Sequence, residues 1–278
     1  SSVLYIVGTP IGNLGDISFR ALKILKNVSL IACEDTRQTK KIMNKYDFKN
    51  NLISFNQHNY FNKTSTIINE LNSGKSVALV SDAGMPGICD PGEALIKDAK
   101  SDGINIICIP GPSAAITALV SSGFPSSKFT FEGFLPKKKS EREKILFEIR
   151  NHYKTTILFE SPHRLKKLLV ELRQHLGAER EIQVFRELTK KFEEHIGFKI
   201  SEVIDYFDEK EVIGEITVVI KGKKQGNGSS QYDELELKND LIDLINAGLN
   251  LSQASKFLAK KTNFSKNEIY NMYKSFSD

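Results

Sequence analysis

Glycine, proline and small polar residues gather in four short stretches of this 278-residue sequence, each following an apolar run. SDAGMPGICDPG (81–92) holds three glycines and two prolines, and GTPIGN (8–13), PGPSA (110–114) and ESPHR (160–164) are similar in character. Such segments bend sharply and leave backbone N–H and C=O groups uncovered by side chains. The chemistry that they permit is recognition of a small polar molecule by the backbone.

Phosphate-binding motifs are absent from the sequence, which restricts what that molecule can be. Neither the Walker A string GxxxxGK[ST] nor the dinucleotide-binding string GxGxxG occurs. In GTPIGN the two glycines are four positions apart, and Thr9-Pro10 stiffens the chain instead of freeing amides for a pyrophosphate. A nucleoside triphosphate or a dinucleotide is therefore not expected.

S-adenosylmethionine fits these stretches better. Its adenine, ribose and amino-acid groups offer many hydrogen-bonding edges, and its sulfonium is attracted by carbonyl dipoles and repelled by a nearby Lys or Arg. SDAGM and GPSA contain neither of these cations. The alternative is that the stretches are only tight turns of the scaffold. Because four of them follow predicted strands, we favour ligand binding.

The elements that must position these stretches follow an α/β pattern. Short β-rich runs alternate with helical patterns, which is typical of sheets covered by helices. In open α/β sheets, ligands collect at the carboxyl ends of the strands, where the four stretches lie. The runs that predict strands are LYIVG, LIAC, VALVSD, INIICIPG, TTILFES, EIQVFRE and EITVVIKG.

Two α/β domains and a small helical appendage are predicted along the chain. SSGFPSS, from residue 121 onward, interrupts a helical pattern and marks the boundary between the α/β domains. KGKKQGNGSSQ, from residue 221 onward, is polar and rich in Gly and Ser, as flexible linkers are. The predicted division is an N-terminal α/β domain 1–121, a C-terminal α/β domain 122–222, a linker 223–232 and a helical domain 233–278.

The appendage is expected to hold two or three short helices that resemble a helix-turn-helix module. Gly248 can end one helix and Ser252 can cap the next, while Ser265 and Glu268 have the spacing of a capping box. The pattern leaves open whether the appendage docks on nucleic acid or supports packing or a dimer.

Composition predicts a soluble, cytoplasmic protein without membrane or metal partners. No apolar run approaches the roughly 20 residues of a membrane span, and the first ten residues lack a signal-peptide pattern. Cys33, Cys89 and Cys108 are far apart and have no CxxC spacing, which favours neither a disulfide framework nor a zinc site. A reducing compartment is therefore expected.

The net charge of +5 permits a nucleic-acid partner without requiring one. Basic residues form three clusters, and each cluster is either a solvated surface or part of a nucleic-acid interface. The clusters are Lys137-Lys138-Lys139 with Arg142 and Lys144, His163-Arg164 with Lys166-Lys167, and Lys221 with Lys223 and Lys224.

In order and spacing, several motifs resemble those of the bacterial 16S ribosomal RNA (cytidine-2'-O)-methyltransferases, a branch of the tetrapyrrole methylase superfamily. The motifs are GTPIGNLGDI, ACEDTR, SDAGMPGICDPG, PGPSA and ILFESPHR, and the resemblance covers residues 3–222. SDAGMPGICDPG is specific to this branch, whereas PGPSA is shared across the superfamily. Porphyrinoid-modifying members usually carry GxGPGD and GDP where this sequence has GTPIGN and SDAGMP, which argues against a tetrapyrrole substrate.

The resemblance implies a two-domain α/β methylase, usually homodimeric, that holds S-adenosylmethionine in the cleft between its domains. Its substrate would be 16S ribosomal RNA in the small ribosomal subunit, at the decoding-region cytidine conventionally numbered 1402. Carried over to this sequence, the cofactor-binding residues would be Pro10, Asp82, Ala83, Gly84, Met85, Ser113, Ala114, Ser161, Pro162 and Thr217.

Methyl transfer to a 2'-hydroxyl is an in-line displacement, which positioning accelerates, and a general base must take the hydroxyl proton. His163 is attractive because an unperturbed histidine titrates near neutrality, but it can equally cap a helix. Glu34 can equally form an ion pair with Arg37. The candidate bases are Glu34, Asp35 and His163, with Glu160 and Glu187 as further candidates.

Arginine suits RNA phosphates because its guanidinium group binds them with two parallel hydrogen bonds, and exposed lysines add salt-dependent, nonspecific affinity. Each arginine can equally form a salt bridge with a neighbouring Glu. The predicted RNA contacts are Arg37, Lys137, Lys138, Lys139, Arg164 and Arg186. Two other functions stay open, which are methylation of a tetrapyrrole and a noncatalytic role in RNA binding or ribosome assembly.

Overall fold

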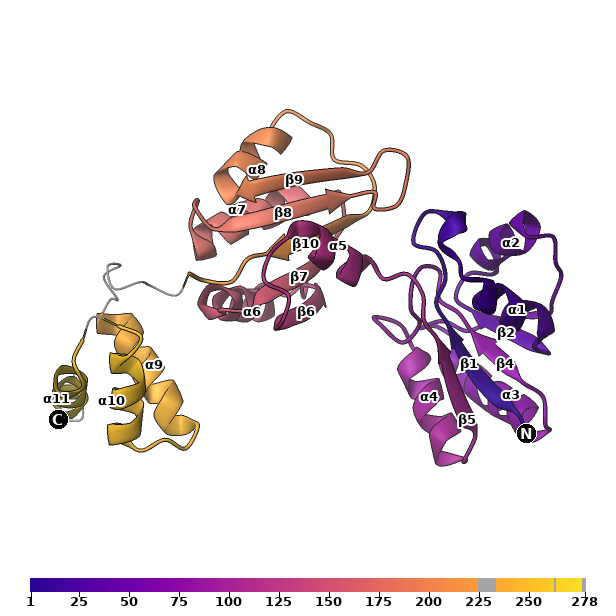
Figure 1. Cartoon of the computed structure of the whole chain (residues 1–278), viewed down its shortest axis with the longest axis horizontal. Coiled ribbons are helices and arrows are strands. Elements are labelled where there is room, and N and C mark those ends of the chain that lie inside the picture. Colours follow the sequence, from indigo (N-terminus) through magenta and orange to yellow (C-terminus); the bar gives the residue numbers. More distant parts are fainter. Residues whose placement is uncertain (225–233, 263, 277–278) are drawn as a thin grey trace. The chain divides into compact units, whose positions relative to one another are not determined.

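Two five-stranded sheets and the helices that cover them make up most of the described chain (Figure 1). The computed structural model describes residues 1–224, 234–262 and 264–276. The chain divides into one unit of residues 1–222, which holds both sheets, and a second unit of residues 223–278. The predicted α/β class is confirmed.

The first sheet is parallel and has the strand order β3-β2-β4-β1-β5. Side chains alternate between its two faces, so Leu4 and Ile6 pack with α3 and α4, whereas Val7 packs with α1 and α2. The elements are β1 (Val3–Val7), α1 (Phe19–Asn27), β2 (Leu30–Cys33), α2 (Thr36–Lys45), β3 (Leu52–Ser54), α3 (Tyr60–Asn72), β4 (Val77–Leu79), α4 (Gly92–Ser101) and β5 (Asn105–Ile109). A short 3-10 helix, η1 (Leu14–Asp16), follows the first loop.

The second sheet is mixed and has the order β6-β7-β10-β8-β9. β6 and β7 are parallel, and the other neighbouring pairs are antiparallel. Helices α6, α7 and α8 cover one face, and α5 packs on the other face against β7 and β10. The elements are α5 (Ala114–Ser122), β6 (Phe129–Phe134), α6 (Lys139–Asn151), β7 (Thr155–Glu160), α7 (Leu165–Leu176), β8 (Glu181–Arg186), β9 (Glu194–Lys199), α8 (Ile200–Phe207) and β10 (Ile216–Ile220).

The domain boundary predicted at residues 121/122 stays a prediction. Gly123 ends α5 in the left-handed conformation (φ 66°), which glycine adopts without strain, and SSGFPSS therefore does terminate a helix. Residues 225–232 of the predicted linker lie outside the described residues.

The second unit contains α9 (Glu234–Asn246), α10 (Leu251–Ala259) and α11 (Lys266–Phe276) around a small apolar core that includes Leu241 and Ile269. The predicted capping box is confirmed, because Glu268 N–H donates to Ser265 Oγ and Ser265 N–H donates to Glu268 Oε2. The prediction that Ser252 caps a helix is wrong. Asn250 is the N-cap of α10, because its side chain accepts from Gln253 N–H while the Gln253 side chain accepts in return.

The loops after β4, β1 and β5 meet at the carboxyl edge of the first sheet, because these strands are neighbours in it. Thr9 and Gly84 exchange backbone hydrogen bonds of 3.1 and 3.0 Å, and Gly8 N–H donates to Ile109 O. A Cβ atom on Gly8 would lie 2.6 Å from Gly111 Cα, closer than two carbon atoms approach without overlap. The loops after β1 and β5 therefore touch backbone to backbone.

Replacing Gly8 by Ala is expected to lower the free energy of unfolding by about 3 kcal/mol, because the added methyl group overlaps a backbone that cannot turn aside. Gly103→Ala is the matched control. Gly103 has a φ of +72° and nothing within 4 Å of the added atom, so only conformational strain of about 1 kcal/mol is expected. Urea unfolding followed by circular dichroism measures both, and equal losses in the two variants would contradict the close contact.

Candidate functional site

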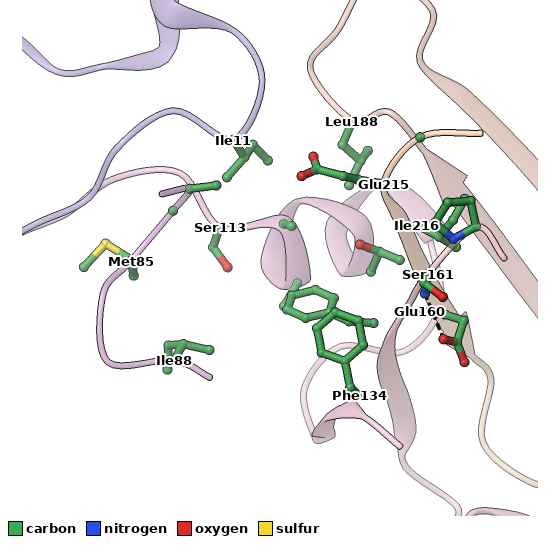
Figure 2. Close-up of a pocket in the computed structure, with 18 residues that line it drawn as sticks. Ile11, Met85, Ile88, Ser113, Phe134, Glu160, Ser161, Leu188, Glu215 and Ile216 are labelled. Carbon is green, nitrogen blue, oxygen red and sulfur yellow. Dashed lines mark hydrogen bonds between the residues drawn. The ribbon is translucent and has the colours of Figure 1, made fainter. Parts of the chain in front are cut away.

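A cavity of about 380 Å³ lies where the loops of the first sheet face strand ends of the second sheet (Figure 2). Its volume falls in the range of about 300–1,000 Å³ that is usual for small-molecule sites. Its lining residues are Ile11, Ala83, Gly84, Met85, Ile88, Ser113, Ala114, Ala115, Phe134, Phe159, Glu160, Ser161, Pro162, Leu188, Gly214, Glu215, Ile216 and Thr217.

The loop after β4 is bent by its own hydrogen bonds. Ser81 Oγ donates to the carbonyl oxygens of Ala83 and Gly84, both at 3.0 Å, and Gly84 has a φ of +79°. Farther along, Asp90 Oδ1 accepts from the N–H groups of Gly87 and Gly92 at 2.7 and 2.9 Å. These bonds fix the turn, so the small residues Ala83 and Gly84 form part of the cavity wall.

The loop after β5 leads into α5, whose first turn also lines the cavity. Ser113 is the N-cap of this helix, and its Oγ accepts from Ile116 N–H at 3.3 Å. Ala114 and Ala115 follow and leave the wall free of bulk. The partial positive charge at the amino end of the helix favours a carboxylate such as that of a bound amino-acid group.

The turn after β7 rests on a buried ionic network. Glu160 Oε1 accepts from Ser161 N–H at 2.8 Å, and the Glu160 carboxylate lies 3.7 Å from Arg142, which also binds Glu171 at 2.6 Å. Arg142 is 6% exposed. Arg142 therefore fits neither alternative given for its basic cluster, a solvated surface or a nucleic-acid interface, because it faces inward from α6 to bind these two carboxylates.

The segment after β8 in the second sheet contacts the loop after β1 in the first sheet. Glu187 and Thr189 have φ angles of 55° and 70°, which are uncommon for residues other than glycine. Thr189 O accepts from Asn13 Nδ2 of the first loop at 3.3 Å, and Leu188 lines the cavity. The backbone is thus held in an unusual conformation where it contacts GTPIGN.

All of the predicted cofactor-binding residues line the cavity except Pro10 and Asp82. Pro10 is buried next to Ile11, which does line it. Asp82 points toward the loop after β2, where its Oδ1 accepts from Asp35 N–H at 2.9 Å. The geometry brings these residues together around one cavity, and their contacts with a cofactor stay a prediction.

None of the predicted bases Glu34, Asp35 and His163 is among the cavity-lining residues. Glu34 Oε1 accepts from Asp82 N–H at 3.1 Å, and burial, reinforced by the nearby carboxylate of Asp82, raises its pKa. Asp35 caps α2, and its hydrogen bonds to Arg37 lower its pKa to about 2. His163 is exposed in the turn that follows Ser161 and Pro162.

The predicted RNA contacts lie in different surroundings. Lys137, Lys138 and Lys139 are exposed after β6, Arg37 is exposed and paired with Asp35, and Arg164 is the N-cap residue of α7. Arg186 is engaged within the protein, because its guanidinium group donates to Glu194 and to the carbonyl oxygens of Phe192 and Ile213. These contacts give Arg186 a structural role, and RNA binding by any of the six residues stays a prediction.

A second group of cavity-lining residues was not predicted from the sequence. Glu160 was named as a candidate base, but its inward ionic contacts were not foreseen. Phe134 and Phe159, whose rings meet edge to face with centroids 5.7 Å apart, offered only an aromatic signal. The cavity-lining residues that were not predicted to bind the cofactor are Ile11, Ile88, Ala115, Phe134, Phe159, Glu160, Leu188, Gly214, Glu215 and Ile216.

The cavity suits S-adenosylmethionine in size and in charge. Among the described residues that line it, none is Lys or Arg, and two are glutamates, so a cation is not repelled. Small residues expose backbone groups on the wall that the first sheet supplies, and the amino end of α5 is available for a carboxylate. No group of three or more His, Cys, Asp or Glu side chains that could hold a metal ion occurs in the described ranges.

Residues 3–204 match the family model of the tetrapyrrole (corrin/porphyrin) methylases, and the chain belongs to this family. It is an enzyme, an S-adenosylmethionine-dependent methyltransferase. Cobalt precorrin-4 methyltransferase, a cobalamin biosynthetic enzyme of known structure, shares the fold, with a TM-score of 0.60 and 17% identity over 79% of this chain and 94% of that chain.

Two curated relatives are more similar in sequence. The ribosomal RNA small subunit methyltransferase I of Bacillus subtilis is 42% identical over 274 residues, which is 98% of this chain and 94% of that protein. The protein of the same name from Thermotoga maritima is 48% identical over 221 residues, which is 80% of this chain and 99% of that protein. The Thermotoga relative therefore has room for little beyond a unit the size of residues 1–222.

In the described part of the chain, no helix has the length and apolar character needed to cross a membrane.

Replacing Glu34 by Gln keeps the oxygen that accepts from Asp82 N–H and removes the charge. Because burial raises the pKa of Glu34 in the folded protein, its ionised form disfavours folding above that pKa. The disadvantage disappears as the pH falls below the unfolded-state value of about 4.3. The variant is therefore expected to be more stable than the parent at pH 7, by only about 0.5 kcal/mol because water screens this partly exposed group, and equal to it near pH 4.

Urea unfolding at pH 7 and pH 4 measures this difference. Glu148→Gln, at an exposed position of α6, is the control for removing one negative charge. A stability difference for Glu34→Gln that does not change with pH would contradict burial as its cause.

Proposed function

We propose that this methyltransferase acts on 16S ribosomal RNA in the small ribosomal subunit, at the ribose 2'-oxygen of the decoding-region cytidine conventionally numbered 1402. The observation that carries the proposal is similarity along nearly the whole chain to proteins named ribosomal RNA small subunit methyltransferase I. The solved enzymes of porphyrin and corrin synthesis are much less similar, at 16% and 17% identity. A tetrapyrrole acceptor is thus the weaker candidate, and a ribosomal substrate accords with a cytoplasmic enzyme.

The proposed cofactor contacts divide between the two walls of the cavity. Ala83, Gly84, Met85, Ser113 and Ala114 would hold one side of S-adenosylmethionine through backbone groups and small side chains, with Pro10 and Asp82 supporting their loops. Ser161, Pro162 and Thr217 would hold the other side. When bound, the cofactor supplies a methyl group that an oxygen nucleophile takes by in-line displacement at the sulfonium.

We propose His163 as the group that takes the proton of the 2'-hydroxyl. His163 directly follows Ser161 and Pro162, which line the cavity, and it is exposed to an incoming substrate. Glu34 and Asp35 are weaker candidates, because each already accepts hydrogen bonds from backbone N–H groups. The neutral imidazole of a histidine can accept a proton, which suits a general base.

The RNA backbone is proposed to pass the exposed lysines after β6. Phe134, the last residue of that strand, lines the cavity, and Lys137, Lys138 and Lys139 follow within a few residues. Phosphates held there would lie near the cavity opening. Arg37 and Arg164 are proposed as further phosphate contacts, and Arg186 as a weaker one because of its internal bonds. The homodimer and the division at residues 121/122 are likewise proposals.

The acceptor is tested by transfer of tritiated methyl from S-adenosylmethionine to small ribosomal subunits from cells that lack this methylation. We expect label in RNA, and after alkaline hydrolysis in an alkali-resistant dinucleotide, because a methylated 2'-oxygen cannot attack its own phosphodiester. Subunits that already carry the methyl group are the control. Naked 16S ribosomal RNA and a tetrapyrrole serve as parallel acceptors. Label in the tetrapyrrole alone would contradict the proposal and identify a tetrapyrrole as the acceptor.

Replacing His163 by Gln is expected to lower kcat by about 10²- to 10³-fold and to leave the affinity for S-adenosylmethionine unchanged, because proton transfer is lost while the cavity is kept. His58→Gln, at another exposed histidine, is the control. An unchanged kcat for the His163 variant would contradict this role and would favour Glu34 or Asp35 as the general base.

A further inference from the structure

Among the described residues that line the cavity, two carry carboxyl groups, and they point in different directions. Glu160 is buried and turned toward Ser161 N–H and Arg142. Glu215, the residue just before the strand β10, has a side chain that is 72% exposed and that extends toward the side of the cavity where Ile11 lies, as Figure 2 shows. A charge of this kind, aimed into a cavity whose lining has no Lys or Arg, is felt by any ligand that enters.

Glu215 is held in this direction by a network with Glu187 and Lys190. Lys190 Nζ lies 2.8 Å from Glu187 Oε2 and 3.2 Å from Glu215 Oε2. Glu187 Oε1 accepts from Glu215 N–H at 2.8 Å, and Glu187 N–H donates to Glu215 O at 3.0 Å. Both the backbone and the carboxylate of Glu215 are thus tied to the segment after β8.

The stem of Lys190 lies against the loop that contains Gly12. A Cβ atom on Gly12 would lie 2.7 Å from Lys190 Cγ. The aliphatic part of the lysine side chain therefore occupies the space that a side chain at Gly12 would need. Lys190 is not among the residues that line the cavity. The lysine therefore contacts Glu215, a cavity-lining residue, without lining the cavity itself.

The network keeps its charges at neutral pH. Burial opposes ionisation of Glu187, but its hydrogen bonds with Lys190 and with Glu215 N–H, together with the positive charges of Lys190 and Arg186, lower its pKa. Burial likewise opposes the charge of Lys190, but Glu187 and Glu215 raise its pKa. Two carboxylates and one ammonium group leave a net charge of about −1 beside the cavity.

We propose that Glu215, positioned by Lys190, makes the cavity selective for the charged methyl donor over its neutral-sulfur product, S-adenosylhomocysteine. The two molecules differ by one methyl group and by the positive charge on sulfur. A nearby carboxylate therefore stabilises the donor and not the product, and methyl transfer itself removes the attraction and favours product release. The inference rests on the cofactor and not on the RNA acceptor, so it stands or falls independently of the substrate.

Titration calorimetry of the full chain with S-adenosylmethionine and with S-adenosylhomocysteine tests this selectivity. For Glu215→Gln we expect the affinity for the donor to fall about fivefold, a moderate effect because most of the Glu215 side chain is exposed to solvent, while the affinity for the product stays within about twofold. Retained product binding also reports a folded cavity. Glu211→Gln, at an exposed site in the segment that precedes β10, removes the same charge and should change neither affinity.

Equal losses for both ligands would overturn the proposal, because they would mean that Glu215 contacts a group common to donor and product, such as the ammonium or the ribose. Unchanged binding of both ligands with slower methyl transfer would also overturn it and would assign Glu215 to proton transfer instead.

The variant Lys190→Met tests whether Lys190 orients the Glu215 side chain or only screens the negative charges of Glu187 and Glu215. If Lys190 orients Glu215, the preference for the donor falls in this variant and returns in Lys190→Arg. If Lys190 merely screens the carboxylates, its removal leaves more negative charge and the preference rises, which would refute the positioning role.

Discussion

The close approach of Gly8 to Gly111 is the contact on which the rest of the cavity depends. Because β1 lies between β4 and β5, its loop must meet both neighbouring loops, and it does so through backbone hydrogen bonds to Gly84 and Ile109. A side chain at Gly8 would separate these loops and open the wall that they share. The scarcity of side chains is therefore a packing requirement of the scaffold as well as a means of exposing backbone groups to a ligand.

The carboxylates of these loops act mainly as clamps on the backbone. Glu34 accepts from Asp82 N–H, Asp82 accepts from Asp35 N–H, and Asp90 accepts from two glycine amides. The arrangement crowds negative charge, and together with burial it raises the pKa of Glu34 and of Asp90. An acidic residue next to a binding loop is thus weak evidence for a base, since holding a bent chain also requires acceptors.

What the sequence predicted correctly is what depends on local chemistry. Every predicted strand exists, because each is an apolar run; most of these strands are buried, and β5 is an edge strand in which only Ile109 is buried. β3, β6 and β9 were not predicted: β3 has three residues, β6 is bulged near Gly133, and β9 is an edge strand with exposed polar side chains. The glycine-rich loops were found for the same local reason, whereas Phe134, Leu188 and Glu215 reach the cavity only through the pairing of distant strands.

The mixed topology of the second sheet explains why Glu215 was not predicted to line the cavity. The prediction assumed that ligand-binding residues follow the carboxyl ends of strands. β10 runs antiparallel to both β7 and β8, so its first residue, Ile216, pairs with Glu160 and Arg186 at their carboxyl ends. One edge of the sheet therefore combines two strand ends with one strand start. Alternation along β10 then turns Thr217 to the same face as Val219, toward α5, and away from Ile216 and Val218. The residue just before the strand, Glu215, is carried to the glycine-rich loops by this pairing, so the charge of the cavity is set by strand direction and not by any local motif.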